Sequence, residues 1–379
     1  MKKTLSKETI KPTSSTPHHL QKLNLSLLDQ ISPPTYVHLL FFYHLPHDLD
    51  HSQLSQTLKK SLSHVLTAFY PLAGRIIPHD SYVDCNDDGV EYVELRVHAC
   101  MSDVAHFDLE PAELQKYVPV EPYGLLESHS KGEVIPLSIQ VNLFDCGGIA
   151  IGVCISHKIA DIESLVMFMN AWATTCRHGS MQASIRPCFD LTRRFPPLDP
   201  SPFPPDRSSL MVKTLKRSSR EVNVRSKASP PLAAHSFGNG TVPATAWSSK
   251  PESGDEQEPY ADLVTKLRNA IRGIDHDYVK QMQDGDYYER MNKNPCDEVD
   301  DVWSEAYIFS SWCRFGVYEV DYGWGKPVWV STIGVPFKNV TVFMDTRCGD
   351  GIEAWVNMIE EDMAVIETNY KHLILSQAF

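Results

Sequence analysis

Residues 148–161 read Gly-Ile-Ala-Ile-Gly-Val-Cys-Ile-Ser-His-Lys-Ile-Ala-Asp, a largely apolar run that reaches His157 and is followed four residues later by Asp161. A short apolar run bounded by turn residues is typical of a buried strand. Imidazole is the side chain whose ordinary pKa, about 6.5, lets it take up and return a proton near neutral pH. His157 is therefore a candidate general base, and a structural histidine at a strand end is the alternative interpretation.

The segments on either side predict regular structure that would hold this histidine in a fixed position. The run Ile135–Leu143 predicts a preceding strand, and Gly147-Gly148 predicts a hairpin that pairs the two strands antiparallel. After Asp161, which is a suitable helix N-cap, apolar residues recur at helical spacing. They are Ile162, Leu165, Val166, Phe168, Met169 and Trp172. The predicted order is strand, His157, helix.

Similar patterns elsewhere predict further helices and strands. Helical spacing predicts helices over residues 54–65 and 260–274, and a turn follows the first of them at Tyr70–Arg75. Strands are expected at Tyr92–Val97 and Val342–Asp345, the latter entering a hairpin through Asp350-Gly351. The polar stretch Asp284–Asp301 is expected to be a surface loop, and the chain shows no internal repeat.

Length and composition set the wider context. A chain of 379 residues suggests two domains. The proline-rich stretch that starts at Pro187 suggests the division, with an N-terminal domain over 1–186, a linker over 187–222 and a C-terminal domain over 223–379. A net charge of −13 argues against nonspecific binding to nucleic acid or to an anionic membrane. The expected partners are small molecules, and a monomer is expected.

The cysteines and the N-terminus suggest a location. The nine cysteines are scattered without a Cys-x-x-Cys pair, which suits reduced thiols. The first residues lack the apolar segment of a signal peptide, and no apolar stretch near the start reaches the roughly 20 residues that span a bilayer. A cytoplasmic protein is therefore expected.

Several common site types fit the sequence poorly. The chain has neither a Gly-x-Ser-x-Gly nor a Gly-x-x-x-x-Gly-Lys motif, and Gly349-x-Gly351-x-x-Ala354 is only a loose match to a dinucleotide fingerprint. His157 and Asp161 supply two ligands where a hydrolytic zinc site needs three, so no metal is expected. A basic stretch is either a solvated loop or a site for an anionic cofactor; it comprises Lys213, Lys216, Arg217, Arg220, Arg225 and Lys227.

A second motif lies some 160 residues after the first and reads Asp321-Tyr322-Gly323-Trp324-Gly325. Together with His157-x-x-x-Asp161 it resembles the paired His-x-x-x-Asp and Asp-Phe-Gly-Trp-Gly motifs of the plant BAHD acyltransferases. Further matching segments are Leu27-Leu28-Asp29-Gln30, Tyr70–Arg75, Ala171-Trp172-Ala173 and Ser236-Phe237-Gly238-Asn239. The sequence looks most similar to the vinorine synthase-like branch, which acetylates alkaloid alcohols.

This resemblance implies an α+β fold of two chloramphenicol-acetyltransferase-like domains, with mixed β-sheets and helices and an active-site channel between the domains. Acyl-CoA, expected as acetyl-CoA, is a co-substrate, and no cofactor is bound permanently. His157 is implied to be the general base in direct transfer to an alcohol on a plant specialised metabolite such as an alkaloid or terpenoid. The candidates for binding the CoA phosphates are Lys213, Lys216 and Arg217.

The resemblance also implies roles for the motif residues. Asp161 is expected to turn away from the site and pair with an arginine, and Asp321 is expected to pair likewise, with Arg225 as the candidate. Gly323, Trp324 and Gly325 are expected to support the site structurally. The indole N–H of Trp324 has a second interpretation as a donor to the oxyanion of the tetrahedral intermediate.

One departure from the family pattern concerns length. Family members run to about 430 to 450 residues, and here a strand and a helix are missing between residues 211 and 225. Their loss would remove buried apolar area from the C-terminal domain, at about 25 cal/mol per Å². An impaired paralogue that at most binds ligand, or a shortened gene model, is therefore the alternative to an active enzyme.

Overall fold

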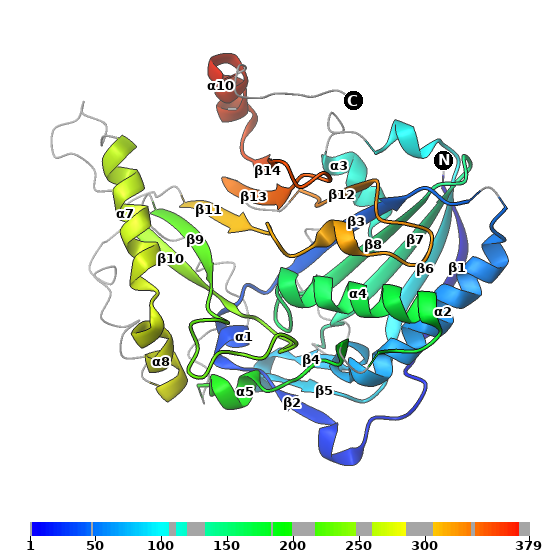
Figure 1. Ribbon diagram of the computed structural model, residues 1–379, viewed down its shortest axis with the longest axis horizontal. Coiled ribbons are helices and arrows are strands. Elements are labelled where there is room, and N and C mark those ends of the chain that lie inside the picture. Colours follow the sequence, from blue (N-terminus) through cyan, green and yellow to red (C-terminus); the bar gives the residue numbers. More distant parts are fainter. Residues whose placement is uncertain are drawn as a thin grey trace.

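The computed structural model describes residues 2–46, 48–105, 111–119, 133–182, 185–198, 217–247, 260–285, 306–334 and 338–370. Within these ranges the strands form two large sheets and one small sheet, with helices between and around them (Figure 1). The predicted mixed α+β class is confirmed.

The first large sheet contains the strand that leads to His157. Its order is β1 (Lys2–Ile10), β6 (Val90–Val97), β7 (Leu137–Phe144), β8 (Ile149–Ser156), β3 (Tyr36–Tyr43) and β12 (Trp329–Ser331). β6 and β7 are parallel, and β7 and β8 are antiparallel around a turn in which Gly147 has a φ of +84°. The predicted hairpin is therefore confirmed. Every residue of β8 is buried, so the strand is a fixed support for the histidine at its end.

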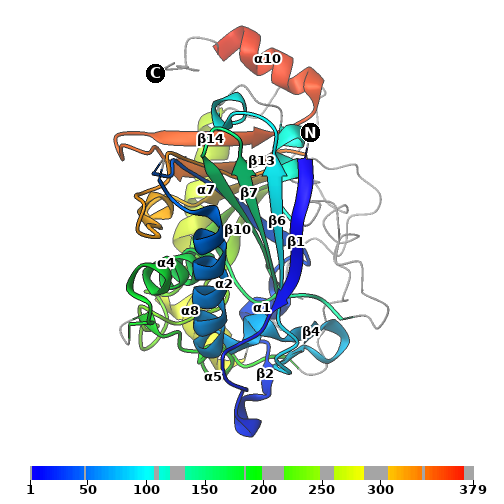
Figure 2. The same cartoon turned by 90° about the vertical axis from the view of Figure 1, so that its right-hand side faces the viewer.

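Two helices cover one face of this sheet. α2 (His51–Ala68) and α4 (Ile162–His178) lie side by side there (Figure 2). The apolar face predicted for α2 is buried, and the indole N–H of Trp172 in α4 donates to the Leu58 carbonyl at 3.2 Å. Burial of each large apolar side chain stabilises this layer by about 1.5–3 kcal/mol. The strand, histidine and helix predicted around residue 157 are thus packed as one unit.

The second large sheet belongs to the C-terminal half. Its order is β10 (Thr241–Trp247), β9 (Arg217–Asn223), β11 (Ala306–Ser311), β13 (Val340–Asp345) and β14 (Ile352–Asn357). α7 (Tyr260–Gly273) lies along β10 and is followed by α8 (His276–Asp284), whereas α10 (Glu360–Tyr370) stands beyond β14 (Figure 1). The predicted hairpin at Asp350-Gly351 is confirmed by the antiparallel pairing of β13 with β14. Most of the predicted loop Asp284–Asp301 lies outside the described residues.

The remaining elements are short. A small sheet contains β2 (Lys22–Asn24), β5 (Tyr82–Asp84) and β4 (Arg75–Ile77), and the short helices are α1 (Leu27–Ile31), α3 (Pro111–Leu114) and α5 (Leu191–Arg194). α1 and α5 pack together, with Leu27, Leu28, Leu191 and Phe195 in one buried cluster.

The division into residues 1–186, 187–222 and 223–379 stays a prediction, and two features bear on it. β9 crosses the expected end of the linker, since it runs from Arg217 to Asn223. A strand therefore does lie in the interval 211–225, in which the sequence was expected to lack one. β12, from the C-terminal half, pairs with β3 and so completes the first sheet. The two halves therefore share a sheet as well as a chain connection.

Candidate active site

His157 directly follows the last residue of β8 and is half-buried. Its backbone N–H donates to the Thr35 carbonyl at 2.8 Å, which continues the pairing of β8 with β3 by one residue. The chain then turns, and α4 begins at Ile162. The imidazole therefore lies between a buried strand and a capped helix, which limits its backbone motion.

The ring is oriented by an amide from the C-terminal half. His157 Nδ1 lies 2.9 Å from Asn239 Oδ1, and Asn239 Nδ2 donates to the His157 carbonyl at 2.8 Å. Asn239 Nδ2 also donates to Asp29 Oδ1 at 2.8 Å. A carbonyl and a carboxylate can only accept, so the NH₂ group must face them and Oδ1 must face the ring. Nδ1 then carries the proton, and in the neutral ring Nε2 is the basic nitrogen.

Asp161 faces away from this ring and is buried. Its Oδ1 accepts from Ser164 N at 2.9 Å and caps α4, and its Oδ2 accepts from Gly240 N at 2.7 Å. Arg225 Nη2 donates to both oxygens at 2.9 Å. The predicted helix cap and the predicted arginine partner are confirmed. Both carboxylate oxygens are occupied by donors other than His157, which argues against a catalytic dyad.

Arg225 ties this corner to the segment that carries Asn239. Beyond Asp161 it donates to the carbonyls of Ser236 and Gly238, each at 2.8 Å, and its Nε lies 3.0 Å from Glu163 Oε2. Burial alone lowers the pKa of Arg225, but the neighbouring carboxylates outweigh burial and raise it. A side chain on Gly240 would collide with this guanidinium, since its Cβ would lie 2.5 Å from Nε. The buried guanidinium of Arg225 thus holds residues 236–240 next to the N-terminus of α4.

The predicted pairing of Asp321 with Arg225 is wrong. Asp321 Oδ2 lies 3.4 Å from Nη1 of Arg177, in the last turn of α4, whereas Arg225 sits at the first turn. The 17 residues of α4 separate these two ends by about 25 Å. Asp321 Oδ1 also accepts from the backbone N–H groups of Gly323 and Gly325, at 2.8 and 3.0 Å. These glycines have φ values of +110° and +108°, so the motif is a tight turn held by its own carboxylate.

Trp324 is too far from the histidine to act on an oxyanion there. Its indole stacks on Tyr322 with ring centroids 5.2 Å apart and meets Tyr43 edge-on at 6.2 Å. Tyr43 pairs with Ile149, the first residue of β8, whereas His157 follows the last. Eight residues of strand span about 26 Å. The oxyanion interpretation is therefore overturned, and the packing interpretation agrees with the observed geometry.

The candidate residues for CoA binding are only partly visible. Lys213 and Lys216 lie outside the described residues, and Arg217 is the first residue of β9, opposite Trp247. Among the described residues, no group of three or more His, Cys, Asp and Glu side chains is arranged to hold a metal ion. Within the same ranges, the helices are too short or too polar to cross a bilayer.

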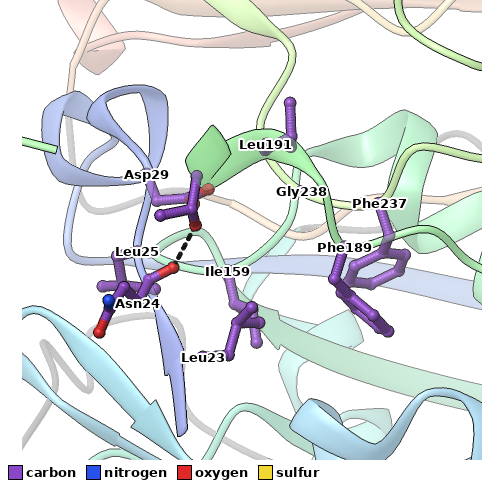
Figure 3. A pocket seen from close by; sticks show the side chains of 10 residues that line it. Leu23, Asn24, Leu25, Asp29, Ile159, Phe189, Leu191, Phe237 and Gly238 are labelled. Atoms are coloured by element: carbon purple, nitrogen blue, oxygen red, sulfur yellow. Dashed lines mark hydrogen bonds between the residues drawn. The ribbon is translucent and has the colours of Figure 1, made fainter. Parts of the chain in front are cut away.

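A small pocket lies behind the orienting residues. It has an empty volume of about 280 Å³ and is lined by Asp29, Gly238 and Ile159, together with Leu191 and the ring of Phe237 (Figure 3). His157 is not among its lining residues. Because that volume includes open solvent and the pocket does not reach the proposed base, we do not assign the acyl donor to it.

Two residues of the site had no predicted role, Asn239 and Asp29. Both lie in segments that matched the family pattern, but the pattern did not show what they contact. The spacing Ser26-x-x-Asp29 does signal a helix N-terminus, and Ser26 and Asp29 form a capping box on α1. Nothing in the local sequence indicates a partner 210 residues away.

Comparison with known proteins gives a consistent result. The model of the Transferase family matches residues 2–221 and 218–373. Stemmadenine O-acetyltransferase from Catharanthus roseus is 37% identical over 426 aligned positions, covering 98% of this chain and 97% of the relative. Vinorine synthase from Rauvolfia serpentina is 36% identical over 429 positions, covering 98% and 97%.

Solved structures agree with these matches. The crystal structure of vinorine synthase superposes with a TM-score of 0.80 at 34% identity, covering 97% of each chain. F. sporotrichioides TRI101, complexed with Coenzyme A and T-2, gives a TM-score of 0.62 at 16% identity, covering 92% of this chain and 97% of that one, which is a likeness of fold alone.

Proposed function

We infer the function from the family: this chain belongs to the Transferase family, the plant BAHD acyltransferases, and is an acyl-CoA-dependent acyltransferase. We propose that it transfers an acetyl group from acetyl-CoA to a hydroxyl group of an alkaloid or terpenoid-like plant metabolite. The relatives named above support this proposal, because one is an O-acetyltransferase of stemmadenine and another is vinorine synthase.

His157 acts as the general base through Nε2. It removes the proton of the acceptor hydroxyl as that oxygen attacks the thioester carbonyl, and the C–S bond then breaks. The imidazolium returns the proton to the departing CoA thiolate, so the histidine ends neutral and no acyl-enzyme forms. The observation that carries this role is the contact of Asn239 Oδ1 with His157 Nδ1, since it leaves Nε2 as the unprotonated nitrogen.

The test of this role is a single substitution. His157→Ala should abolish acetyl transfer from labelled acetyl-CoA to a panel of alkaloid and terpenoid alcohols, because a general base contributes about 10²–10⁴-fold. The fold should persist, since the side chain is half-buried and supplies chemistry more than packing. Turnover equal to wild type in this variant would refute the role.

An impaired paralogue is the second candidate function. The alignment with the stemmadenine relative has 426 positions and this chain has 379 residues, so the relative carries residues that this chain lacks. Protein that is folded and binds CoA, yet is inert towards the whole acceptor panel, would favour this candidate. Sequencing the transcript across codons 205 to 225 separates a real deletion from a shortened gene model.

The CoA phosphates are assigned to Lys213, Lys216 and Arg217 on the family resemblance alone. Arg225 of the same basic stretch is not a candidate, because it is buried against Asp161. Gly323, Trp324 and Gly325 support the fold at the far end of α4, as does Asp321. The enzyme acts as a cytoplasmic monomer. The acetyl donor and the acceptor reach His157 through a channel between the two halves of the chain.

A further inference from the structure

A chain of hydrogen bonds runs from the His157 ring through Asn239 to the carboxylate of Asp29. Asp29 Oδ1 accepts from both nitrogens of Asn239, from Nδ2 at 2.8 Å and from the backbone N at 3.2 Å. Asp29 Oδ2 accepts from the backbone N and the hydroxyl of Ser26, at 2.8 and 2.7 Å. Four donors thus converge on one buried side chain.

The hydrogen-bond donors around Asp29 favour its acceptor form. Burial raises the pKa of Asp29 above its ordinary value, and the hydrogen bonds from Ser26 and Asn239 offset only part of that rise. A protonated carboxyl would place its own hydrogen against one of the donors. An ionised Asp29 therefore satisfies all four donors at once.

The orientation of the Asn239 amide decides which nitrogen of His157 is basic. If the amide were turned over, its NH₂ group would face Nδ1, which would then have to accept. The proton would move to Nε2, and the neutral ring could not take a proton from the acceptor there. The two hydrogens of Nδ2 are held by two acceptors, the His157 carbonyl and Asp29 Oδ1. Losing Asp29 would leave one buried N–H without an acceptor and would weaken the bias towards the observed orientation.

A lysine next to the base fixes α1 to the same turn. Lys158 Nζ is buried and donates to the carbonyls of Gln30 and Ser32, at 3.0 and 2.6 Å. The end of α1 and the residue after His157 are therefore joined directly. α1 is thus tied to the segment of the histidine through the Asp29 side chain in its first turn and through backbone carbonyls at its C-terminal end.

We propose that Asp29 is a positioning residue for the base, acting through Asn239 to hold His157 in its Nδ1–H tautomer. The effect on catalysis rests on the proposed function, in which His157 is the general base. The tautomer itself can be measured without any turnover.

The test compares two matched truncations on α1. Asp29→Ala removes the contact to Asn239. Gln30→Ala removes a neighbouring buried side chain that bonds the backbone of Leu198 through its Oε1 and Nε2. Each protein is labelled with ¹⁵N-histidine, and the His157 signals are assigned by their loss in His157→Gln.

We expect the neutral ring of wild-type His157 to carry its proton on Nδ1, and we expect Gln30→Ala to keep that state. Asp29→Ala should shift the signals towards the Nε2–H tautomer. It should also lower kcat about tenfold or more, with the KM for acetyl-CoA changed less than about twofold, as for other residues that orient a functional histidine. If Asp29→Ala does not fold, Asp29→Asn serves, because an amide cannot accept from donors on both sides.

An Nε2–H tautomer in the wild type would overturn the proposal, as would an Asp29 variant whose spectrum and kcat match those of Gln30→Ala. The second result leaves the role of His157 as base untouched, whereas an Nε2–H tautomer in the wild type would also count against Nε2 as the basic nitrogen. Conversely, full activity of His157→Ala would refute the proposed function and leave the tautomer result standing.

Discussion

Arg225 Nη2 contacts both carboxylate oxygens of Asp161 at 2.9 Å, and both side chains are buried. The pair joins the N-terminus of α4 to the segment that carries Asn239. A buried ion pair adds little net stability when compared with apolar residues, but removing one partner leaves an uncompensated charge. The pair is therefore a structural requirement of the site.

Asp161→Ala should lower the free energy of unfolding by about 3–5 kcal/mol, because Arg225 would stay buried without its main partner. Activity should fall with it, through the displacement of Asn239. Urea denaturation measures the stability, and Glu163→Gln is the control, since Glu163 is partly exposed and should cost less than about 1 kcal/mol. An Asp161 variant with wild-type stability and impaired proton transfer would favour a catalytic dyad.

Asp321→Ala should affect stability more than chemistry. The substitution leaves the backbone N–H groups of Gly323 and Gly325 without their acceptor. This loss should lower the free energy of unfolding by about 1–2 kcal/mol. Arg177→Ala removes only a partly exposed ion pair and should cost less than about 1 kcal/mol. The midpoint of thermal unfolding and kcat per folded molecule are the measurements. A loss of kcat without a loss of stability in Asp321→Ala would contradict the structural role.

Trp324→Phe should keep kcat within about twofold of wild type, because the indole packs at the opposite end of β8 from His157. Among the described residues, its buried Nε1 has no hydrogen-bond partner, so losing that N–H costs no bond seen there. An oxyanion donor would instead cost about 10²–10³-fold in kcat. Steady-state kinetics on the two proteins distinguishes these outcomes. Trp324→Ala should lower the midpoint of thermal unfolding, because the rings of Tyr43 and Tyr322 would lose a packing partner.

Glu353 should make stability depend on pH. Burial on β14 raises the pKa of Glu353 from 4.5 to about 7. Between these two values the folded state holds a proton that the unfolded state has released, so this group's contribution to the free energy of unfolding falls as pH rises. Above pH 7 its contribution stays constant.

Glu353→Gln should remove that component. Urea denaturation gives the free energy of unfolding at pH 5 and at pH 8. The value at pH 5 minus the value at pH 8 should be smaller for Glu353→Gln than for wild type. Glu361→Gln, at an exposed position on α10, is the matched control and should behave like wild type. Identical pH dependence in all three proteins would contradict the raised pKa.

Most of the fold near the site was predictable because its signals are local. The buried strand β8, its glycine turn and the amphipathic α4 follow from residues adjacent in sequence, and so does the cap at Asp161. The turn at residues 321–325 was also predictable, since two glycines bracket the tryptophan, and both glycines have a positive φ in the structure.

Partner choice was harder to predict. Asp321 and Asp161 each suggested a salt bridge, yet Asp321 was given the wrong arginine. Arg177 lies 144 residues before Asp321, and its nearness depends on how the C-terminal half folds back over α4. Sequence spacing carries no information about such a contact. The same holds for Trp324, whose aromatic partners come from β3 and from its own turn.

Local sequence is enough to define the units around the site: a buried strand that ends at His157, a capped helix after it and a glycine-bracketed turn near the C-terminus. It is also enough to identify the family, because two motifs in fixed order are specific together. Which atoms face His157 depends on how distant segments pack. Asn239 lies 82 residues from it and Asp29 lies 210 residues from Asn239. Hydrogen bonds act over about 3 Å, so these contacts exist only once three separate segments are packed together.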